Sequence, residues 1–212
     1  MPSSTPKKAA SKGERTRAAI LERAVDHALE VGLRGVTLGD LAEQVGLSKS
    51  GLYAHFGSKT ALQIAVLDHA GEKFVARVLL PALERPRGLE RLASLMDAWI
   101  SVCRDAEPNG CLFVKASMEL DSDPGPVRDR LRDQHLAYYD SIARIVRGGV
   151  AAGQLRSDLD ADQVARDLYG IMLGYYQALR LLEDASAESR ARTAITALVD
   201  GVRAHPYEEP RP

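Results

Sequence analysis

Residues 48–55, SKSGLYAH, place several hydrogen-bonding side chains on one surface of a short predicted helix. At helical spacing Leu52 faces inward together with Phe56, and the side chains left outside are those of Lys49, Ser50, Gly51, Tyr53 and His55. Small residues at the start of a helix permit close approach, and hydroxyl, ammonium and imidazole groups reach phosphate oxygens and base edges. A helix that enters the major groove of DNA presents such a surface. The pattern therefore predicts DNA contact.

Two predicted helices joined by a tight turn position this surface. Thr37 can cap a first helix, whose buried stripe consists of Leu38, Leu41, Ala42 and Val45. Gly46 ends that helix, because a residue without Cβ adopts the left-handed conformation at low cost. Ser48 can cap the second helix, which begins at Lys49. The segment 37–59 thus predicts a helix-turn-helix.

Lys59 adds a second indication of DNA contact. Gly57 ends the second helix, Ser58 can cap the next, and Lys59 falls in its first turn, where a cation opposes the helix dipole unless an anion binds nearby. Taken one at a time, these side chains also fit structural roles: Tyr53 a packing contact, His55 a helix cap and Lys59 a solvated surface. The spacing of the whole set favours DNA contact.

Residues 13–70 resemble the N-terminal domain of TetR-type (tetracycline-repressor-like) regulators, most specifically in SKSGLYAHFGSK at residues 48–59. The resemblance implies an all-helical homodimer that binds a palindromic double-stranded DNA operator and is released by a small-molecule effector in its C-terminal domain. Carried across by position, it implies DNA contacts at Thr37, Ser48, Lys49, Tyr53, His55 and Lys59. In the family the tyrosine and histidine mostly touch the DNA backbone, whereas Ser50 and Gly51 fall where related proteins vary their base readout.

Composition agrees with a cytoplasmic DNA-binding chain. The 212 residues are 45% hydrophobic and carry a net charge of −1, but residues 1–59 hold nine Lys and Arg against six Asp and Glu. We expect residues 1–11 to form a flexible basic arm, either a DNA contact or a solubilising tail. No stretch is long and apolar enough to span a membrane. Cys103 and Cys111 lack metal-ligand spacing, which favours reduced thiols and leaves a redox pair as the alternative.

The remaining chain shows helical periodicity interrupted by glycine and proline, without strand alternation. We therefore expect an all-α fold of about nine helices. It comprises a three-helix helix-turn-helix DNA-binding domain at 12–58, a helical ligand-binding and dimerisation domain at 59–204 and an exposed tail at 205–212. The fourth helix runs from Lys59 towards Leu83, and we expect Gly71 to interrupt it.

Residues 159–204 carry more apolar surface than one core contact requires. Such helices are either central in a bundle or shared with a partner subunit, and small residues four apart allow two helices to approach closely. We expect a two-fold dimer, as in the resembling family, with an interface that includes Tyr169, Gly170, Leu173, Gly174, Ala178, Ala194, Ile195, Leu198 and Val202.

A cavity for the effector is expected among the helices between the two ends. Its lining is predicted from large side chains, several with polar tips: Phe74, Met96, Trp99, Cys103, Phe113, Met118, His135, Tyr138, Tyr139, Met172, Tyr175 and Tyr176. His135 is the sharpest single candidate, although a core histidine with internal hydrogen bonds is the commoner role. No cluster of histidine, cysteine or carboxylate side chains has ligand spacing, so no metal or other cofactor is predicted.

Two other classes of function stay open on the sequence. One is a DNA-binding protein that responds to no ligand, and the other is an all-helical enzyme, although the sequence contains no GxSxG, HExxH, phosphate-binding loop or dinucleotide motif. The sequence leaves the effector, the operator and the choice between repression and activation undetermined.

Overall fold

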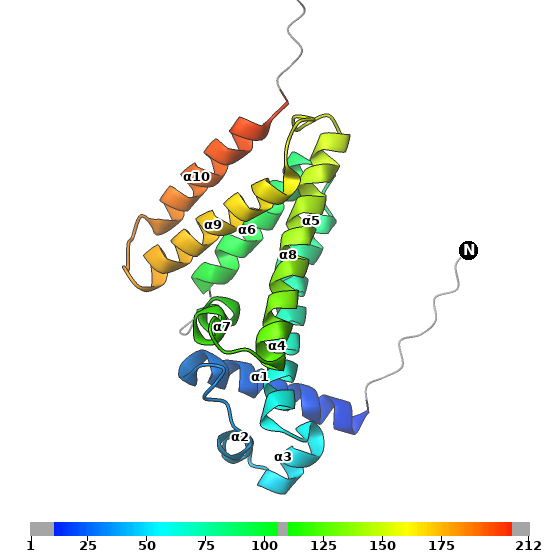
Figure 1. The fold of residues 1–212 in the computed structure, drawn as a ribbon, viewed down its shortest axis with the longest axis vertical. Coiled ribbons are helices and arrows are strands. Elements are labelled where there is room, and N and C mark those ends of the chain that lie inside the picture. Colours follow the sequence, from blue (N-terminus) through cyan, green and yellow to red (C-terminus); the bar gives the residue numbers. More distant parts are fainter. Residues whose placement is uncertain (1–10, 106–109, 205–212) are drawn as a thin grey trace, which may run out of the picture.

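The computed structural model describes residues 11–105 and 110–204, and within these ranges all regular elements are helices. In Figure 1 the short helices α2 (Leu38–Val45) and α3 (Lys49–Phe56) lie at one end beneath α1 (Lys12–Val31). A long helical rod rises from them and comprises α4 (Lys59–Phe74), a π-helical turn η1 (Val75–Leu79) and α5 (Leu80–Leu83). The upper bundle adds α6 (Leu89–Asp105), α8 (Pro126–Ala151), α9 (Ala161–Arg180) and α10 (Ala187–Val202). Helix α7 (Leu112–Leu120) lies crosswise between the two parts.

Counting the α4–η1–α5 rod as one helix, the described residues contain nine helices, which confirms the predicted all-α class. The rod corrects one detail, because it passes through Gly71 without a break. Its irregularity falls instead at the π-helical turn over residues 75–79, where the hydrogen bonds span one residue more than in an α-helix. Of the arm expected at residues 1–11, only Ser11 is described, and it caps α1; the tail expected at 205–212 lies outside the described residues.

Local side-chain caps define the helix-turn-helix as predicted. The Thr37 hydroxyl accepts the Asp40 amide at the start of α2 (3.2 Å), and the Ser48 hydroxyl accepts the Gly51 amide at the start of α3 (3.0 Å). Gly46 ends α2 in the left-handed conformation, with φ of 67° and ψ of 29°. These bonds satisfy backbone groups that a helix end leaves free, so the two short helices begin and end where the sequence places the capping residues.

The buried apolar side chains form two clusters. The first, here called the N-terminal core, joins side chains of α1–α4 to four from far along the chain: Leu112, Ala116, Leu120 and Leu131. The second, the bundle core, is built from η1, α5, α6 and α8–α10. The domain boundary expected at residue 58 therefore does not separate the hydrophobic cores, because α4, α7 and the start of α8 complete the core beneath the helix-turn-helix.

Polar contacts from α7 hold the turn that follows α1. The Glu119 carboxylate accepts the backbone amides of Leu33 (3.2 Å) and Arg34 (3.0 Å), and the Lys115 ammonium donates to the Leu29 carbonyl (2.7 Å). Gly32 makes this geometry possible, because its φ of 80° and ψ of 157° lie in a region that side chains rarely adopt. Helix α7 thus fixes the end of α1 through side chains more than 80 residues away in sequence.

Gly32→Ala should lower the free energy of unfolding by about 1–3 kcal/mol, because the alanine backbone would be strained. The added Cβ would also lie 2.7 Å from the Glu119 carboxylate. Urea denaturation followed by circular dichroism measures the change. Gly13→Ala is the control, since a Cβ at Gly13 in α1 would have no atom within 4 Å, and this variant should keep or slightly raise stability. Equal stability of Gly32→Ala and the wild type would contradict the account of this turn.

Candidate nucleic-acid interface and internal cavity

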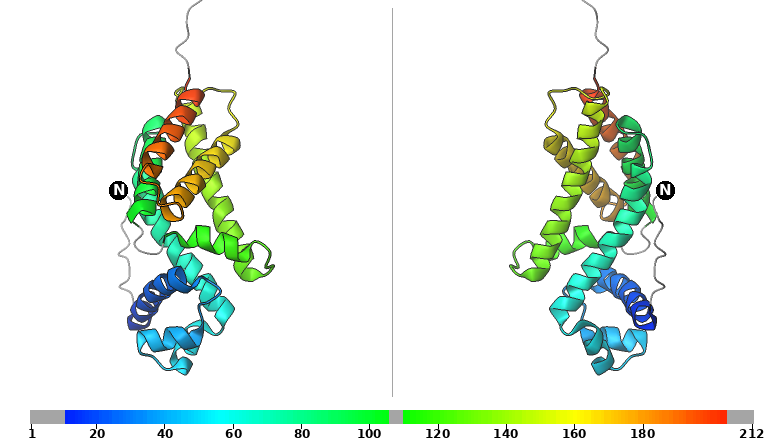
Figure 2. Two further views of the ribbon diagram at one scale, coloured as in Figure 1. Left: turned by 90° about the vertical axis from the view of Figure 1, so that its left-hand side faces the viewer. Right: turned by 90° about the vertical axis from the view of Figure 1, so that its right-hand side faces the viewer.

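Helix α3 rests on the N-terminal core through two buried side chains and presents its other faces outward. Leu52 and Phe56 are buried, whereas the Tyr53 side chain is 57% exposed. Lys49 and Ser50 are exposed, and Gly51 and His55 are half-buried. Figure 2 shows α2 and α3 beyond α1, at the end of the molecule remote from the bundle. The predicted DNA-contacting side chains on α3 therefore share one accessible surface.

Three hydroxyl groups and one lysine of the predicted DNA-contacting set, those of Thr37, Ser48, Ser50 and Lys59, already have partners within the chain. The Thr37 hydroxyl donates to the Asp40 carboxylate (2.8 Å) while it caps α2, so its hydrogen is engaged. The Ser48 and Ser50 hydroxyl oxygens are 3.1 Å apart. The Lys59 ammonium donates to the Arg34 carbonyl (2.7 Å), which leaves two of its three donors for a phosphate.

Gly51 and Arg17 have structural roles in addition to any DNA contact. A Cβ at Gly51 would lie 3.2 Å from the Ser48 hydroxyl oxygen, so the glycine gives room to the helix cap. The Arg17 guanidinium stands 5.1 Å from the centre of the Phe56 ring and joins the start of α1 to the end of α3. Lys12 is exposed at the start of α1, and Lys7 and Lys8 fall outside the described residues.

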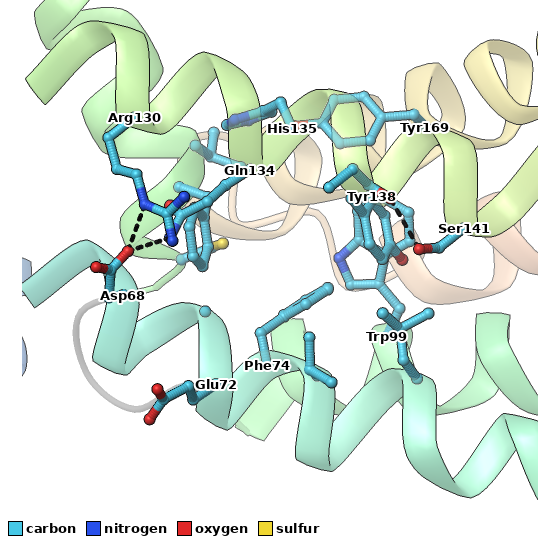
Figure 3. A pocket seen from close by; sticks show the side chains of 17 residues that line it. Asp68, Glu72, Phe74, Trp99, Arg130, Gln134, His135, Tyr138, Ser141 and Tyr169 are labelled. Carbon is cyan, nitrogen blue, oxygen red and sulfur yellow. Dashed lines mark hydrogen bonds and ion pairs between the residues drawn. The ribbon is translucent and has the colours of Figure 1, made fainter. Parts of the chain in front are cut away.

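A cavity of about 420 Å³ opens between the α4–η1 segment, α6, α7, α8 and α9 (Figure 3). Five side chains predicted to line a pocket lie on its wall: Phe74, Trp99, Phe113, His135 and Tyr138. Their rings contact one another edge to face, with 5.0 Å between the ring centres of Phe74 and Tyr138 and the same distance between Trp99 and Tyr138. The volume suits one small molecule, and the wall is largely apolar.

The other seven predicted lining residues do not line this cavity. Four of them pack in the bundle core: Met96, Cys103, Met172 and Tyr175. Met118 is 71% exposed, because Leu112, Ala116 and Leu120 form the buried face of α7. The Tyr176 hydroxyl accepts the Cys111 amide (3.3 Å). Tyr139 is half-buried between the Tyr169 ring and the Arg166 guanidinium.

The sequence prediction missed the polar part of the wall, which includes Asp68, Arg130, Gln134 and Ser141. Figure 3 shows Asp68, Arg130 and Gln134 together at one end of the cavity. The Gln134 amide nitrogen donates to the Leu67 carbonyl (3.2 Å) and to the Asp68 carboxylate (3.1 Å), and Arg130 pairs with the same carboxylate. No local sequence signal marks Arg130 and Gln134 as cavity residues, because their shared partner Asp68 lies on α4, 62 and 66 residues earlier.

Two residues of the wall each have a buried polar atom without a partner among the described residues: the Gln134 side-chain oxygen and the Tyr138 hydroxyl. Burial raises the pKa of Tyr138 well above its usual value, so this hydroxyl stays protonated. His135, in contrast, has both ring nitrogens engaged, one with the Leu131 carbonyl (2.9 Å) and one with the Ser117 hydroxyl (3.2 Å). Among the wall residues, Gln134 and Tyr138 are thus the two with a fully buried side-chain polar atom that lacks a partner.

The residues predicted for a dimer interface differ in how exposed they are to solvent. Gly170, Gly174 and Ala194 are exposed, and Leu173, Ala178 and Leu198 are half-buried. Three others are corrected, because they are buried within this chain: Tyr169, Ile195 and Val202. Tyr169 also lines the cavity. The accessible part of the predicted set is thus Gly170, Leu173, Gly174, Ala178, Ala194 and Leu198.

Neither cysteine is paired with another, and burial raises the pKa of both thiols, that of Cys103 to about 12. The thiols therefore stay protonated near neutral pH. Within residues 11–105 and 110–204, no group of three histidine, cysteine or carboxylate side chains could hold a metal ion. No helix in those ranges is long and apolar enough to cross a membrane.

Both the N-terminal and the C-terminal part of the chain match known protein families. Residues 20–66 match the family described as bacterial regulatory proteins, tetR family, and residues 88–195 match the tetracyclin repressor-like C-terminal domain. The chain is 27% identical over 184 residues to the HTH-type transcriptional repressor ComR of Escherichia coli (strain K12), which covers 86% of this chain and 87% of that protein.

Solved structures agree with the family match. A TetR transcriptional regulator from Chloroflexus aurantiacus J-10-FL is 27% identical, with a TM-score of 0.79 over 92% of this chain and 99% of that one. AibR, whose structure was solved in complex with isovaleryl coenzyme A and operator DNA, shares the fold at 22% identity, with a TM-score of 0.69 over 86% of this chain and 98% of that one. The capped helix-turn-helix, the helical bundle and these matches together show that the chain belongs to the TetR family of ligand-responsive, DNA-binding transcriptional regulators.

Proposed function

We propose that the chain acts in the bacterial cytoplasm as a homodimeric repressor that binds a palindromic operator and is released by a small molecule in the α4–α9 cavity. The exposed polar surface of α3, seated on buried Leu52 and Phe56, carries this proposal. Lys49, Tyr53, His55 and Lys59 would contact the DNA backbone, and the small residues Ser50 and Gly51 would approach the base edges. Thr37 and Ser48 would contribute mainly by capping the helices that bear these groups.

Dimerisation through α9 and α10 would place two α3 helices on one face of the DNA. No atom of the chain lies within 4 Å of a Cβ built at Gly170 or Gly174, so both positions have open space in front of them for a second copy. A two-fold dimer of this kind presents recognition helices about 34–36 Å apart, one turn of B-DNA.

Release would follow from elements that the cavity and the N-terminal core share. Phe74 and Phe113 line the cavity, and they belong to α4 and α7. The first residue of α4 is Lys59, and α7 holds the end of α1 through Glu119. An effector that favours a shifted arrangement of these helices would change the separation of the α3 helices, with a coupling free energy of about 1–3 kcal/mol.

Two other functions explain less of the structure. A DNA-binding protein without an effector would not account for a cavity with two unpaired polar atoms on its wall. For an enzyme the carboxylate–guanidinium pair of Asp68 and Arg130 is the main polar cluster, and it lacks a neighbouring nucleophile poised by a base. We therefore assign the cavity to effector binding.

Tyr53→Ala should reduce operator affinity by more than about tenfold, because an exposed backbone-contacting group is lost from the centre of α3. Stability should change little, since Tyr53 is largely exposed. A mobility-shift assay with DNA selected by the wild-type protein from a random pool measures the affinity, and sedimentation confirms the dimer. Normal DNA binding by this variant would show that α3 is not the recognition helix.

Gly174→Arg should convert the dimer into folded monomers. The substituted side chain has open space within the chain but would collide with a second α9 at the interface. Gly13→Arg is the matched control, because Gly13 also has no neighbouring atom and lies in α1, far from α9. Analytical ultracentrifugation distinguishes the two states, and a stable Gly174→Arg dimer would place the interface elsewhere.

A further inference from the structure

We propose that the cavity takes an uncharged, flat aromatic molecule that carries a hydroxyl group at each end, a diphenol in chemical terms. The inference rests on the proposed function, since it names the effector class of the same cavity. Three observations carry it: an unpaired acceptor at Gln134, an unpaired hydroxyl at Tyr138 and a wall that has aromatic rings but no unpaired cation among its described residues.

The Gln134 side-chain oxygen requires a hydrogen-bond donor on the ligand. Both acceptors of the Gln134 amide nitrogen, the Leu67 carbonyl and the Asp68 carboxylate, belong to α4. Arg130 holds the Asp68 carboxylate in turn. Because neither α4 group can donate a hydrogen bond in its ionised or carbonyl form, the amide cannot be reversed, and its oxygen is left as a pure acceptor. A ligand must therefore bring an O–H or N–H group to satisfy this atom.

The Tyr138 hydroxyl sets the second requirement at the other end of the cavity. Figure 3 shows Tyr138 beside Trp99, away from the cluster of Asp68, Arg130 and Gln134. This hydroxyl is buried without a partner, and it can donate or accept. A ligand hydroxyl at this end would satisfy it in either direction. The ligand thus needs a polar group at each of its two ends, and the cavity wall between Gln134 and Tyr138 is apolar.

The wall between the two polar ends suits an aromatic ring system. The Phe74 ring stands edge to face with Trp99 (6.1 Å between ring centres, 86° between planes) and with Tyr138 (5.0 Å, 73°). Such rings present both edges and faces, and a flat ligand can meet them in the offset or edge-to-face arrangements that aromatic pairs prefer. The remaining wall includes the aliphatic side chains of Val75 and Leu79.

The charges on the wall disfavour an anionic ligand. Arg130 is the cation among the described lining residues, and it is paired with Asp68. Glu72 adds a second carboxylate. A carboxylate or a phosphate entering the cavity would meet a net negative wall and lose its hydration without gaining a free cation. The ligand class is therefore distinct from acyl coenzyme A thioesters and free fatty acids.

Isothermal titration calorimetry of the DNA-free dimer with three matched naphthalenes tests the proposal. We expect 2,6-dihydroxynaphthalene to bind, 2,6-dimethoxynaphthalene to bind at least about tenfold more weakly because it cannot donate to Gln134, and naphthalene-2,6-dicarboxylate not to bind. Equal binding of the dimethoxy compound, tighter binding of the dicarboxylate, or no binding of the diphenol would each overturn the proposal.

The Tyr138→Phe variant tests whether the Tyr138 hydroxyl binds the ligand. The variant should fold with at least the wild-type stability, because it removes a buried hydroxyl that has no partner, and it should bind the diphenol about fivefold to tenfold more weakly. Tyr139→Phe is the control, since Tyr139 is not on the wall, and it should bind like the wild type. Unchanged affinity in Tyr138→Phe would overturn the assignment of this end.

A separate mobility-shift assay distinguishes failure of this inference from failure of the proposed function. If the diphenol binds with the expected selectivity but leaves the operator complex intact, the ligand class stands and the release mechanism fails. If the protein binds operator normally but selects the dicarboxylate, the DNA-binding function stands and the ligand class is wrong.

Discussion

The contact of α7 with α1 and α4, the two helices that carry the helix-turn-helix, is the constraint on which the rest of the structure depends. The three N-terminal helices bury only a modest apolar surface among themselves, since small units leave much of their surface in water. Here Leu112, Ala116 and Leu120 of α7 complete the core beneath them, together with Leu131 of α8. The DNA-contacting surface is therefore positioned by a helix that reaches it from the middle of the chain.

This dependence explains how a cavity in the bundle can affect a distant surface. Helix α7 bears Phe113 on the cavity side and Lys115 and Glu119 on the side of α1. Helix α4 bears Phe74 in the cavity and begins at Lys59, next to α3. A π-helical turn follows directly after Phe74, and such turns are common at functional sites in helices. Two elements thus run from the cavity to the N-terminal core that supports the helix-turn-helix, and packed elements transmit small shifts because they have few alternative arrangements.

The predictable parts of the structure were those governed by local chemistry. Thr37, Gly46 and Ser48 define helix ends through bonds to residues three or four positions away, so their spacing was sufficient. The cavity wall depends on how each helix is rotated and on its neighbours, and there the sequence prediction placed only part of the set correctly in space. Met118 has the right chemistry, but the buried face of α7 points the other way. Gln134 was missed because its role comes from two groups on α4, 66 and 67 residues earlier.

The operator affinity of Glu119→Ala tests the central claim most directly, because Glu119 holds the turn that follows α1 but lies on α7, away from the surface of α3. If α7 positions the helix-turn-helix, this variant should remain a folded dimer and bind operator about tenfold more weakly than the wild type. The neighbouring substitution Met118→Ala, at an exposed position, should leave affinity unchanged. Wild-type affinity in Glu119→Ala would show that the DNA-binding helices are positioned without α7 and would contradict the account.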